Sequence, residues 1–359
     1  FGFCYSSESK NPTTDHLVVE NIAGDSKNFS ALIDGLKPET TYYIRAYAIN
    51  EKGTGYSETF VYTTPEPTLI EGNEGDVDVV EAGGLSNFID DTNKYNITKL
   101  KVSGYLNGDD IRLIREMAGR DVNGNETPGR LVDLDVSEAT IVAGGDYYYL
   151  EDGQYKCWAN DNIIGNYMFS ATILNSILLP NNAVSLGNCA FYACTSLANI
   201  SIPDNVVTMG IHTFRECTAL TDVKLGNSVT KIDEYDFLGC TSLVNINIPN
   251  SVTSIGDFAF SECASLEKID IPNSVTSIGS SVFQNTGLKS VIIPDNITSI
   301  SDYVFNNCSA LESVTIPIGV TSIGRMSFSG SPLSSIIIPE NVTFIDGYAF
   351  YKCTSLSEV

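Results

Sequence analysis

The sequence predicts a mainly β protein whose carboxyl-terminal half is a solenoid of 22–23-residue units. An atypical amino-terminal cap with a short helix precedes the solenoid, and an antiparallel β-sandwich-like domain precedes the cap. The observations behind this are a phenylalanine repeat, a proline repeat in step with it, and a strongly acidic segment ahead of both. We expect a β domain at 1–64, a linker and acidic cap with degenerate repeats at 65–162, and a solenoid at 163–359 that breaks off within its last unit.

The repeat is defined by phenylalanine at spacings of 22 or 23 residues. Its members are Phe169, Phe191, Phe214, Phe237, Phe260, Phe283, Phe305, Phe328 and Phe350. Each unit also carries a Leu-x-x-Ile-x-Ile-Pro segment, as in 266–272, in which the alternation predicts a short strand that proline ends. One unit cannot bury its apolar face alone, so the nine copies are expected to stack around one continuous core with a column of phenylalanine rings.

The cysteines follow the same period. Six of the nine lie three residues after a repeat phenylalanine: Cys194, Cys217, Cys240, Cys263, Cys308 and Cys353. In the three units without this cysteine, the next leucine comes five residues after the phenylalanine instead of six. We therefore predict that the cysteine is a small buried side chain that fills a longer turn. A disulfide between Cys194 and Cys217, or between Cys240 and Cys263, stays an alternative, because rungs about 5 Å apart lie within disulfide range.

Taken together, these motifs resemble a known family. Ser-Val-Thr-Ser-Ile-Gly, Ala-Phe, Cys-x-Ser-Leu and Ile-x-Ile-Pro in 251–272 are similar to the BspA-like leucine-rich repeats of bacterial surface proteins, and the match covers roughly 163–359. The resemblance implies a cell-surface or secreted protein that binds or adheres to host or matrix proteins or to glycans. It also implies a signal or anchor outside this sequence.

The segment ahead of the repeats differs in composition, with 20 acidic and 8 basic residues in 66–162. Within it, 97–102 and 131–136 alternate like degenerate first rungs of the solenoid. Residues 109–119 have apolar side chains at helical spacing, acids at the start and glycine at the end, which predicts a short amphipathic helix. A solenoid needs such an atypical unit to cover its open end. This cap also resembles segments that precede the repeats in the same family.

The first 64 residues have an antiparallel β pattern. Leu36-x-Pro38-x-Thr40-x-Tyr42, with the alternation that follows it, resembles the strand E to strand G portion of a fibronectin type III domain, and the resemblance makes Tyr42 the tyrosine-corner residue. Sequence for the first two strands of such a sandwich is lacking, so either those strands lie outside this sequence or the domain is a variant. The proline-rich 63–68 is expected to be a stiff linker and the domain a spacer.

Charge and segment length exclude several classes of function. The net charge is −24, from 44 acidic and 20 basic residues, so the protein repels phosphate backbones and nucleic acid is not an expected partner. Apolar runs are far shorter than the roughly 20 residues that span a bilayer, so no transmembrane segment is expected.

No recognised catalytic, cofactor or metal motif occurs. The two histidines, His16 and His212, lie about two hundred residues apart, so a nucleophile–histidine pair is not expected; His212 is interpreted as a solvated turn residue. Residues 52–55 contain two glycines but fall in a predicted hairpin turn. Residues 121–125 start like an EF-hand loop but lack its glycine and its final glutamate, so they predict a polar turn. We expect no catalytic residue, no cofactor and no metal.

Binding is expected on the exposed face of the repeat strands, where residues between the inward isoleucines point outward. This face is mostly small and polar and lacks the Trp, Tyr and Arg of a typical protein hot spot, so a flat solvated sheet is an equal interpretation. Its most differentiated members are the candidate partner-binding residues: Asp222, Lys224, Asn245, Asn247, Lys268, Asp270 and Ile292.

Three hypotheses of function follow. The first is a non-enzymatic surface or secreted protein that binds a protein or glycan ligand through the solenoid. The second treats the repeats as a rigid stalk, and the third as the accessory module of a polysaccharide-processing system.

Overall fold

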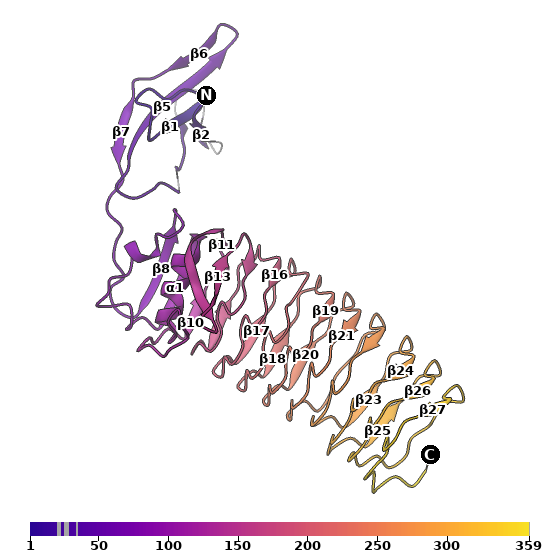
Figure 1. The fold of residues 1–359 in the computed structure, drawn as a ribbon. Helices are drawn as coiled ribbons and strands as arrows, with labels where there is room; N and C mark the ends of the chain where they lie inside the picture. Colours follow the sequence, from indigo (N-terminus) through magenta and orange to yellow (C-terminus); the bar gives the residue numbers. More distant parts are fainter. Residues whose placement is uncertain (20–22, 25–28, 34, 359) are drawn as a thin grey trace. The chain divides into compact units, whose positions relative to one another are not determined.

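The computed structural model describes residues 1–19, 23–24, 29–33 and 35–358, and it divides into two compact units, 1–69 and 70–359 (Figure 1). Val359, with which the predicted solenoid ends, lies outside the described residues. None of the helices in the described ranges is long and apolar enough to cross a membrane.

The amino-terminal unit is an antiparallel sheet. It contains β1 (Gly2–Ser6), β2 (Leu17–Val18), β5 (Thr41–Asn50), β6 (Gly53–Tyr56) and β7 (Phe60–Thr63), and a separate pair contains β3 (Ala23–Gly24) and β4 (Phe29–Ser30). Tyr42 is buried, and its hydroxyl accepts a hydrogen bond from the backbone N–H of Lys37 at 3.0 Å, the upstream contact expected of a tyrosine corner. The assignment to the fibronectin type III class stays a prediction. Residues 52–55 lie at the β5–β6 turn, as predicted.

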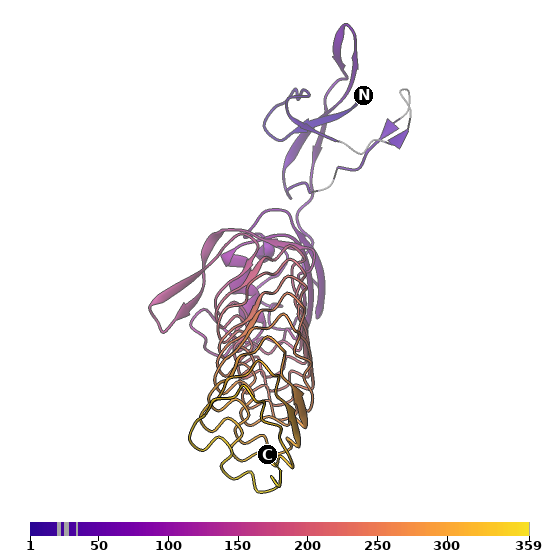
Figure 2. The ribbon, with the colours of Figure 1, turned by 90° about the vertical axis from the view of Figure 1, so that its right-hand side faces the viewer.

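The second unit is a β-solenoid of about 12 turns with a spacing of about 23 residues, which confirms the predicted fold class (Figures 1 and 2). The cap contains β8 (Glu74–Val79), the 3-10 helix η1 (Leu85–Asn87), β9 (Lys99–Leu106), α1 (Gly108–Met117), β10 (Asp133–Asp135), β11 (Ala139–Ile141), β12 (Gly144–Glu151) and β13 (Tyr155–Ala159). The repeats contain β14 (Ile163–Ile164), β15 (Ser176–Leu178), β16 (Ser185–Leu186), β17 (Asn199–Ser201), β18 (Asp222–Lys224), β19 (Lys231–Ile232), β20 (Asn245–Asn247), β21 (Ser254–Ile255), β22 (Ser277–Ile278), β23 (Ser290–Ile292), β24 (Ser299–Ile300), β25 (Ser313–Thr315), β26 (Ser322–Ile323) and β27 (Phe344–Ile345).

The cap strands are rungs of the same solenoid. β8, β9, β10 and β15 pair in parallel, with Leu100, Leu134 and Ile177 in register and buried. The first parallel rung is β8, which lies before Ile97, where the sequence pattern placed the start of the degenerate repeats. β8 was not predicted from the sequence, because Gly75 takes the inward position that leucine holds in the rungs of β9 and β10.

The helix of the cap forms as predicted. Asn107 is its N-cap and accepts from the backbone of Asp109, and the Asp110 side chain accepts in return from the backbone N–H of Asn107. The helix ends before Gly119, whose φ of +90° is a conformation that residues with a side chain rarely adopt.

The predicted aromatic column is confirmed. The nine repeat phenylalanines stack in sequence from Phe169 to Phe350, with ring centroids 5.2–5.8 Å apart and interplanar angles of 2–21°. All but Phe350 are fully buried. The column therefore joins successive turns through one continuous set of offset ring contacts.

The cysteines are free, and five of the six repeat cysteines are fully buried, in agreement with the predicted role as packing residues. Each repeat cysteine also donates its S–H to the backbone carbonyl of the phenylalanine one turn earlier, as Cys217 does to Phe191 at 3.1 Å and Cys308 to Phe283 at 3.0 Å. The three shorter turns, which lack this cysteine, are filled by a hydroxyl side chain instead. The buried hydroxyls of Thr172, Thr286 and Ser331 fill the same position there and bond a phenylalanine carbonyl.

The periodic glycine of the Ser-Ile-Gly motif is required by close stacking of the backbone. A Cβ on Gly256 would lie 2.6 Å from the backbone nitrogen of Glu234 in the preceding turn, a distance that real Cβ atoms do not reach. Because neighbouring turns touch here through their backbones, any side chain would force them apart.

Candidate functional site

The exposed face of the rung strands carries two columns of outward side chains, one on each side of the inward residue. In the repeats, the register places Asn199, Asp222 and Asn245 in the first column, and Ser201, Lys224 and Asn247 in the second. All six are exposed, as the alternation predicted. The structure therefore brings the predicted Asp222, Lys224, Asn245 and Asn247 together on the adjacent strands β18 and β20.

The other three predicted residues lie further along the solenoid. Lys268 and Asp270 fall in a turn without an assigned strand, and they form an ion pair of 3.4 Å with each other at the surface. Ile292 is 74% exposed on β23. The hydrogen-bonded sheet of β17, β18 and β20 thus stops before Lys268, and Ile292 belongs to the separate pair β23–β25.

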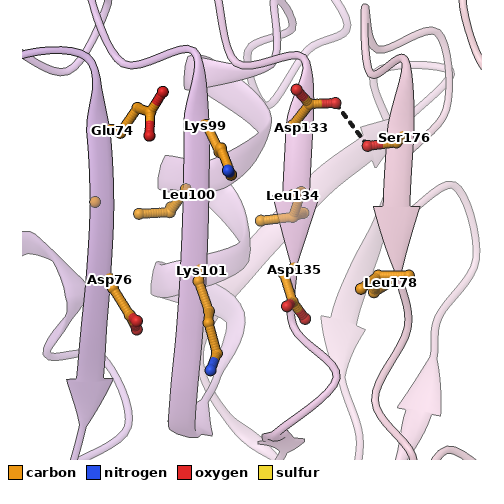
Figure 3. Close-up of a pocket in the computed structure, with 11 residues that line it drawn as sticks. Glu74, Asp76, Lys99, Leu100, Lys101, Asp133, Leu134, Asp135, Ser176 and Leu178 are labelled. Carbon is orange, nitrogen blue, oxygen red and sulfur yellow. Dashed lines mark hydrogen bonds between the residues drawn. The ribbon is translucent and has the colours of Figure 1, made fainter.

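The same two columns continue into the cap, where they become strongly charged. Glu74 on β8, Lys99 on β9 and Asp133 on β10 are register partners in the first column. In the second column, Asp76, Lys101 and Asp135 hold the equivalent positions. A lysine-bearing strand therefore lies between two acidic strands (Figure 3).

These side chains line a surface groove of about 620 Å³, which we name the charged groove. Its outward lining residues are Glu74, Asp76, Lys99, Lys101, Asp133, Asp135, Ser176 and Leu178. Four carboxylates against two ammonium groups give the lining a net negative charge. The groove is an elongated strand surface with no enclosed chamber, which suits a ligand that lies across several rungs.

Contacts within the charged groove hold some of its members in place. Ser176 donates to Asp133 at 2.6 Å, and Lys101 forms an ion pair with Glu138 at 3.0 Å beside the groove. The Glu138 contact, together with the charges of Asp76 and Asp135, raises the pKa of Lys101, so this lysine is fully cationic at neutral pH. For Lys99, no ion pair within 4 Å is found among the described residues.

The charged groove was not predicted, although part of its signal is present in the sequence. Lys99-Leu-Lys101 and Asp133-Leu-Asp135 lie inside the two segments recognised as degenerate rungs. In both rungs the leucine points inward, so the two lysines and the two aspartates point outward and lie beside each other. The partner strand Glu74–Val79 was not recognised, so the second acidic strand had no predicted place.

A second column of large side chains runs along the turns that precede the buried phenylalanines. Tyr235 stacks on His212 at 4.7 Å and on Phe258 at 5.1 Å, and all three have a φ of about +60°. His212 is half-buried and its Nδ1 is buried without a partner among the described residues, so its interpretation as a solvated residue is wrong. Burial, with the nearby charge of Arg215, lowers its pKa, and the ring acts as a neutral stacking element.

No arrangement typical of catalysis or metal binding occurs among the described residues. His16 accepts from the backbone of Thr13 in an exposed turn, and no group of three or more His, Cys, Asp or Glu side chains in the described ranges could hold a metal ion. Asp121 accepts from the backbones of Asn123 and Asn125 at 2.8 Å, which makes 121–125 a self-contained polar turn.

Comparison with known proteins identifies the repeat type. A family model described as "BspA type Leucine rich repeat region" matches residues 162–288 and 276–359. Similar solved structures include a leucine-rich repeat protein of T. pallidum, 34% identical over 47% of this chain and 80% of that chain, with a TM-score of 0.42. A leucine-rich repeat protein from Bacteroides ovatus is 22% identical over 91% and 88% of the two chains, with a TM-score of 0.44. The pneumococcal vaccine antigen PcpA is 15% identical over 91% and 94%, with a TM-score of 0.30. No curated protein matches this chain.

Proposed function

Because the chain belongs to the BspA-type leucine-rich repeat family, we propose that it is a non-enzymatic binding protein of the bacterial cell surface or the extracellular space. Its ligand is a host or matrix polypeptide that presents a basic segment to the exposed strand face. The amino-terminal unit serves as a spacer ahead of the solenoid.

The charged groove is the observation that carries this proposal. The exposed strand face of the repeats carries mostly small polar side chains. At the cap end, by contrast, four carboxylates and two lysines lie on adjacent strands. A groove of one dominant sign raises the local concentration of oppositely charged partners and speeds their association. The lysines add specificity, because a partner must place its own acidic groups opposite Lys99 and Lys101.

The residues first selected from the sequence extend the same surface. Asp222 and Lys224 lie in the two columns that begin in the charged groove, two rungs beyond Ser176 and Leu178. A partner long enough to leave the groove along the columns would meet these side chains next. We therefore assign them a secondary role in binding.

The test is binding of the purified protein to an immobilised panel of fibronectin, laminin and collagen. A variant with Glu74→Gln, Asp76→Asn, Asp133→Asn and Asp135→Asn should bind its ligand at least tenfold more weakly than the unmodified protein. A control with Glu262→Gln, Asp295→Asn, Glu340→Gln and Glu358→Gln neutralises four exposed acids outside the charged groove and changes the net charge equally. This control should retain binding.

Salt provides a second readout, since raising NaCl from 50 to 300 mM should weaken binding of the unmodified protein but hardly affect the groove variant. Equal binding by the groove variant and its control would show that the charged groove is not the site. Loss of binding only with alanine at Asp222, Lys224, Lys268 and Asp270 would move the site to the repeats. Absence of any ligand in the panel would favour the rigid-stalk hypothesis.

A further inference from the structure

The turn of the solenoid between β10 and β15 contains an insertion. Leu134 and Ile177 are register partners on neighbouring rungs but lie 43 positions apart, whereas the partners Ile200 and Val223 lie 23 apart. The extra chain forms the hairpin of β12 and β13, which stands out from the side of the solenoid in Figure 2. The inward residues Tyr148 and Cys157 of this hairpin belong to the core, whereas its outward side chains are available for another purpose.

The hairpin displays aromatic rings to solvent. Trp158, the one tryptophan of the sequence, is 46% exposed, and Tyr155 is 66% exposed. The Trp158 ring packs edge-on against Tyr147 at 6.0 Å, and the Lys156 ammonium lies 4.5 Å from the Tyr147 ring. These contacts hold Trp158 in place while leaving much of its ring exposed, so a ligand would meet a preorganised surface.

A depression of about 760 Å³ lies beside this strand, which we name the hairpin depression. Its volume is in the range of small-ligand sites. β13 forms one side of it, with Tyr155 and Trp158 projecting from opposite faces of the strand, and residues 163–166 and 185–187 form the other side. The charged groove and the hairpin depression share no lining residue.

Polar groups with fixed positions line the same depression. Glu151 accepts from the hydroxyl of Tyr167 at 2.8 Å, and Asn166 accepts from the backbone of Asn188 at 2.9 Å. The Asn166 acceptor bond leaves its amide NH₂ as a donor, and the carboxylate of Glu151 retains further acceptor capacity. Asn160 adds another amide to the lining.

Flat exposed rings beside amide and carboxylate groups match the chemistry of a sugar, which has apolar C–H faces and a rim of hydroxyls. The charged side chains of the lining are Glu151 and Lys156, which balance, so the depression offers no excess charge to an ionic ligand. The net charge of −24 further repels polyanionic glycans. We propose that the hairpin depression binds a neutral oligosaccharide that crosses the edge of β13. Tyr155 and Trp158, which project from opposite faces of this strand, each stack on the C–H face of a different sugar, and Glu151, Asn160 and Asn166 bond to the hydroxyls.

The position of Trp158 makes the proposal directly testable, because excitation at the red edge of the indole absorption band selects this one tryptophan over the 18 tyrosines. Titration with cellohexaose, maltohexaose, mannohexaose and xylohexaose should give a saturable change in Trp158 emission with at least one of them. Heparin and oligogalacturonate should give none. Calorimetry should confirm the same affinity without relying on fluorescence.

Variants separate the site from the rest of the molecule. Trp158→Ala and Tyr155→Ala should each weaken oligosaccharide binding at least tenfold by calorimetry, and Trp158→Phe should retain part of it. Tyr105→Ala is the matched control, since it removes a ring that is 51% exposed on the cap strand β9, outside the depression, and should leave binding unchanged. Unchanged circular dichroism and thermal unfolding would establish that each variant is folded.

The proposal is overturned if no neutral oligosaccharide binds, if only anionic glycans or peptides change the emission, or if Trp158→Ala binds as well as the unmodified protein. The four-residue variant of the charged groove should bind the oligosaccharide normally. The experiments therefore distinguish failure of polypeptide binding by the charged groove from failure of oligosaccharide binding by the hairpin depression.

Discussion

At the scale of the residue, one repeat position shows how a single side chain departs from its neighbours. The residue before each buried phenylalanine is small or apolar in most units, as Ala259 is before Phe260, but Asp236 occupies it in one unit. Asp236 is fully buried and accepts from the backbones of Thr213 at 3.1 Å and Asp233 at 2.7 Å. Burial outweighs these bonds and raises its pKa to about 7.

This carboxyl predicts a pH dependence of stability. The unfolded chain ionises it near 3.8, so the folded state binds the proton more tightly. Its contribution to stability is complete at low pH and is lost as pH rises through 7. Between pH 6 and pH 8 the loss should be about 1.4 kcal/mol in the free energy of unfolding, and Asp236→Ala should abolish that part of the difference.

Urea denaturation at the two pH values measures the effect. Asp222→Ala removes an exposed acid from the strand face and should keep the full pH dependence of the unmodified protein. If Asp236→Ala and Asp222→Ala showed the same difference between pH 6 and pH 8, Asp236 would not be the titrating group.

At the scale of the element, α1 depends on one carboxylate. Asp110 is buried and accepts three backbone N–H bonds, from Gly83 at 2.6 Å, Leu85 at 2.9 Å and Asn107 at 2.8 Å. The first two donors belong to the segment around η1, and the third is the N-cap. Asp110 therefore both caps the helix and fastens the preceding loop to it.

Replacing Asp110 should destabilise the cap strongly. Asp110→Ala leaves three buried donors without a partner, and the expected cost is about 3 kcal/mol or more in the free energy of unfolding. Asp109→Ala is the neighbouring control, since Asp109 is exposed and its backbone N–H still bonds Asn107; its cost should be below about 1 kcal/mol. Thermal unfolding followed by circular dichroism compares the two, and equal melting temperatures would contradict the role of Asp110.

At the scale of the whole molecule, the solenoid is held by contacts between successive turns. The phenylalanine column, the cysteine bonds to preceding carbonyls and the backbone contact at Gly256 all join one turn to the next. In such an architecture stability is approximately a sum of units and nearest-neighbour interfaces. A change in the middle of the column disturbs two interfaces, and a change at its end disturbs one.

The column predicts a dependence on position. Phe260→Ala removes a fully buried ring with neighbours on both sides and should cost about 3–5 kcal/mol. Phe350→Ala removes a partly buried ring that stacks on Phe328 alone and should cost clearly less. Urea midpoints of the two variants test this, and a loss for Phe350→Ala as large as for Phe260→Ala would exclude a nearest-neighbour column.

The sequence by itself determined the period, the aromatic column, the buried cysteines, the outward position of Asp222 and Lys224, and the helix at 109–119. Each follows from a local rule, because the spacing of apolar residues sets which side chains face inward and the capping residues set where a helix begins and ends. Repetition then makes one unit predict the next.

Only the tertiary structure decided which side chains from different turns meet. The pairing of β8 with β9 puts Glu74 and Asp76 beside Lys99 and Lys101. The sequence of β8 does not contain the repeat motif, so this register could not be predicted from it. Trp158 of the hairpin lines a depression together with Ile163. His212 stacks on Tyr235, which lies one full turn later in the solenoid. These contacts depend on long-range stacking and on an insertion outside the period, for which a sequence pattern has no local signal.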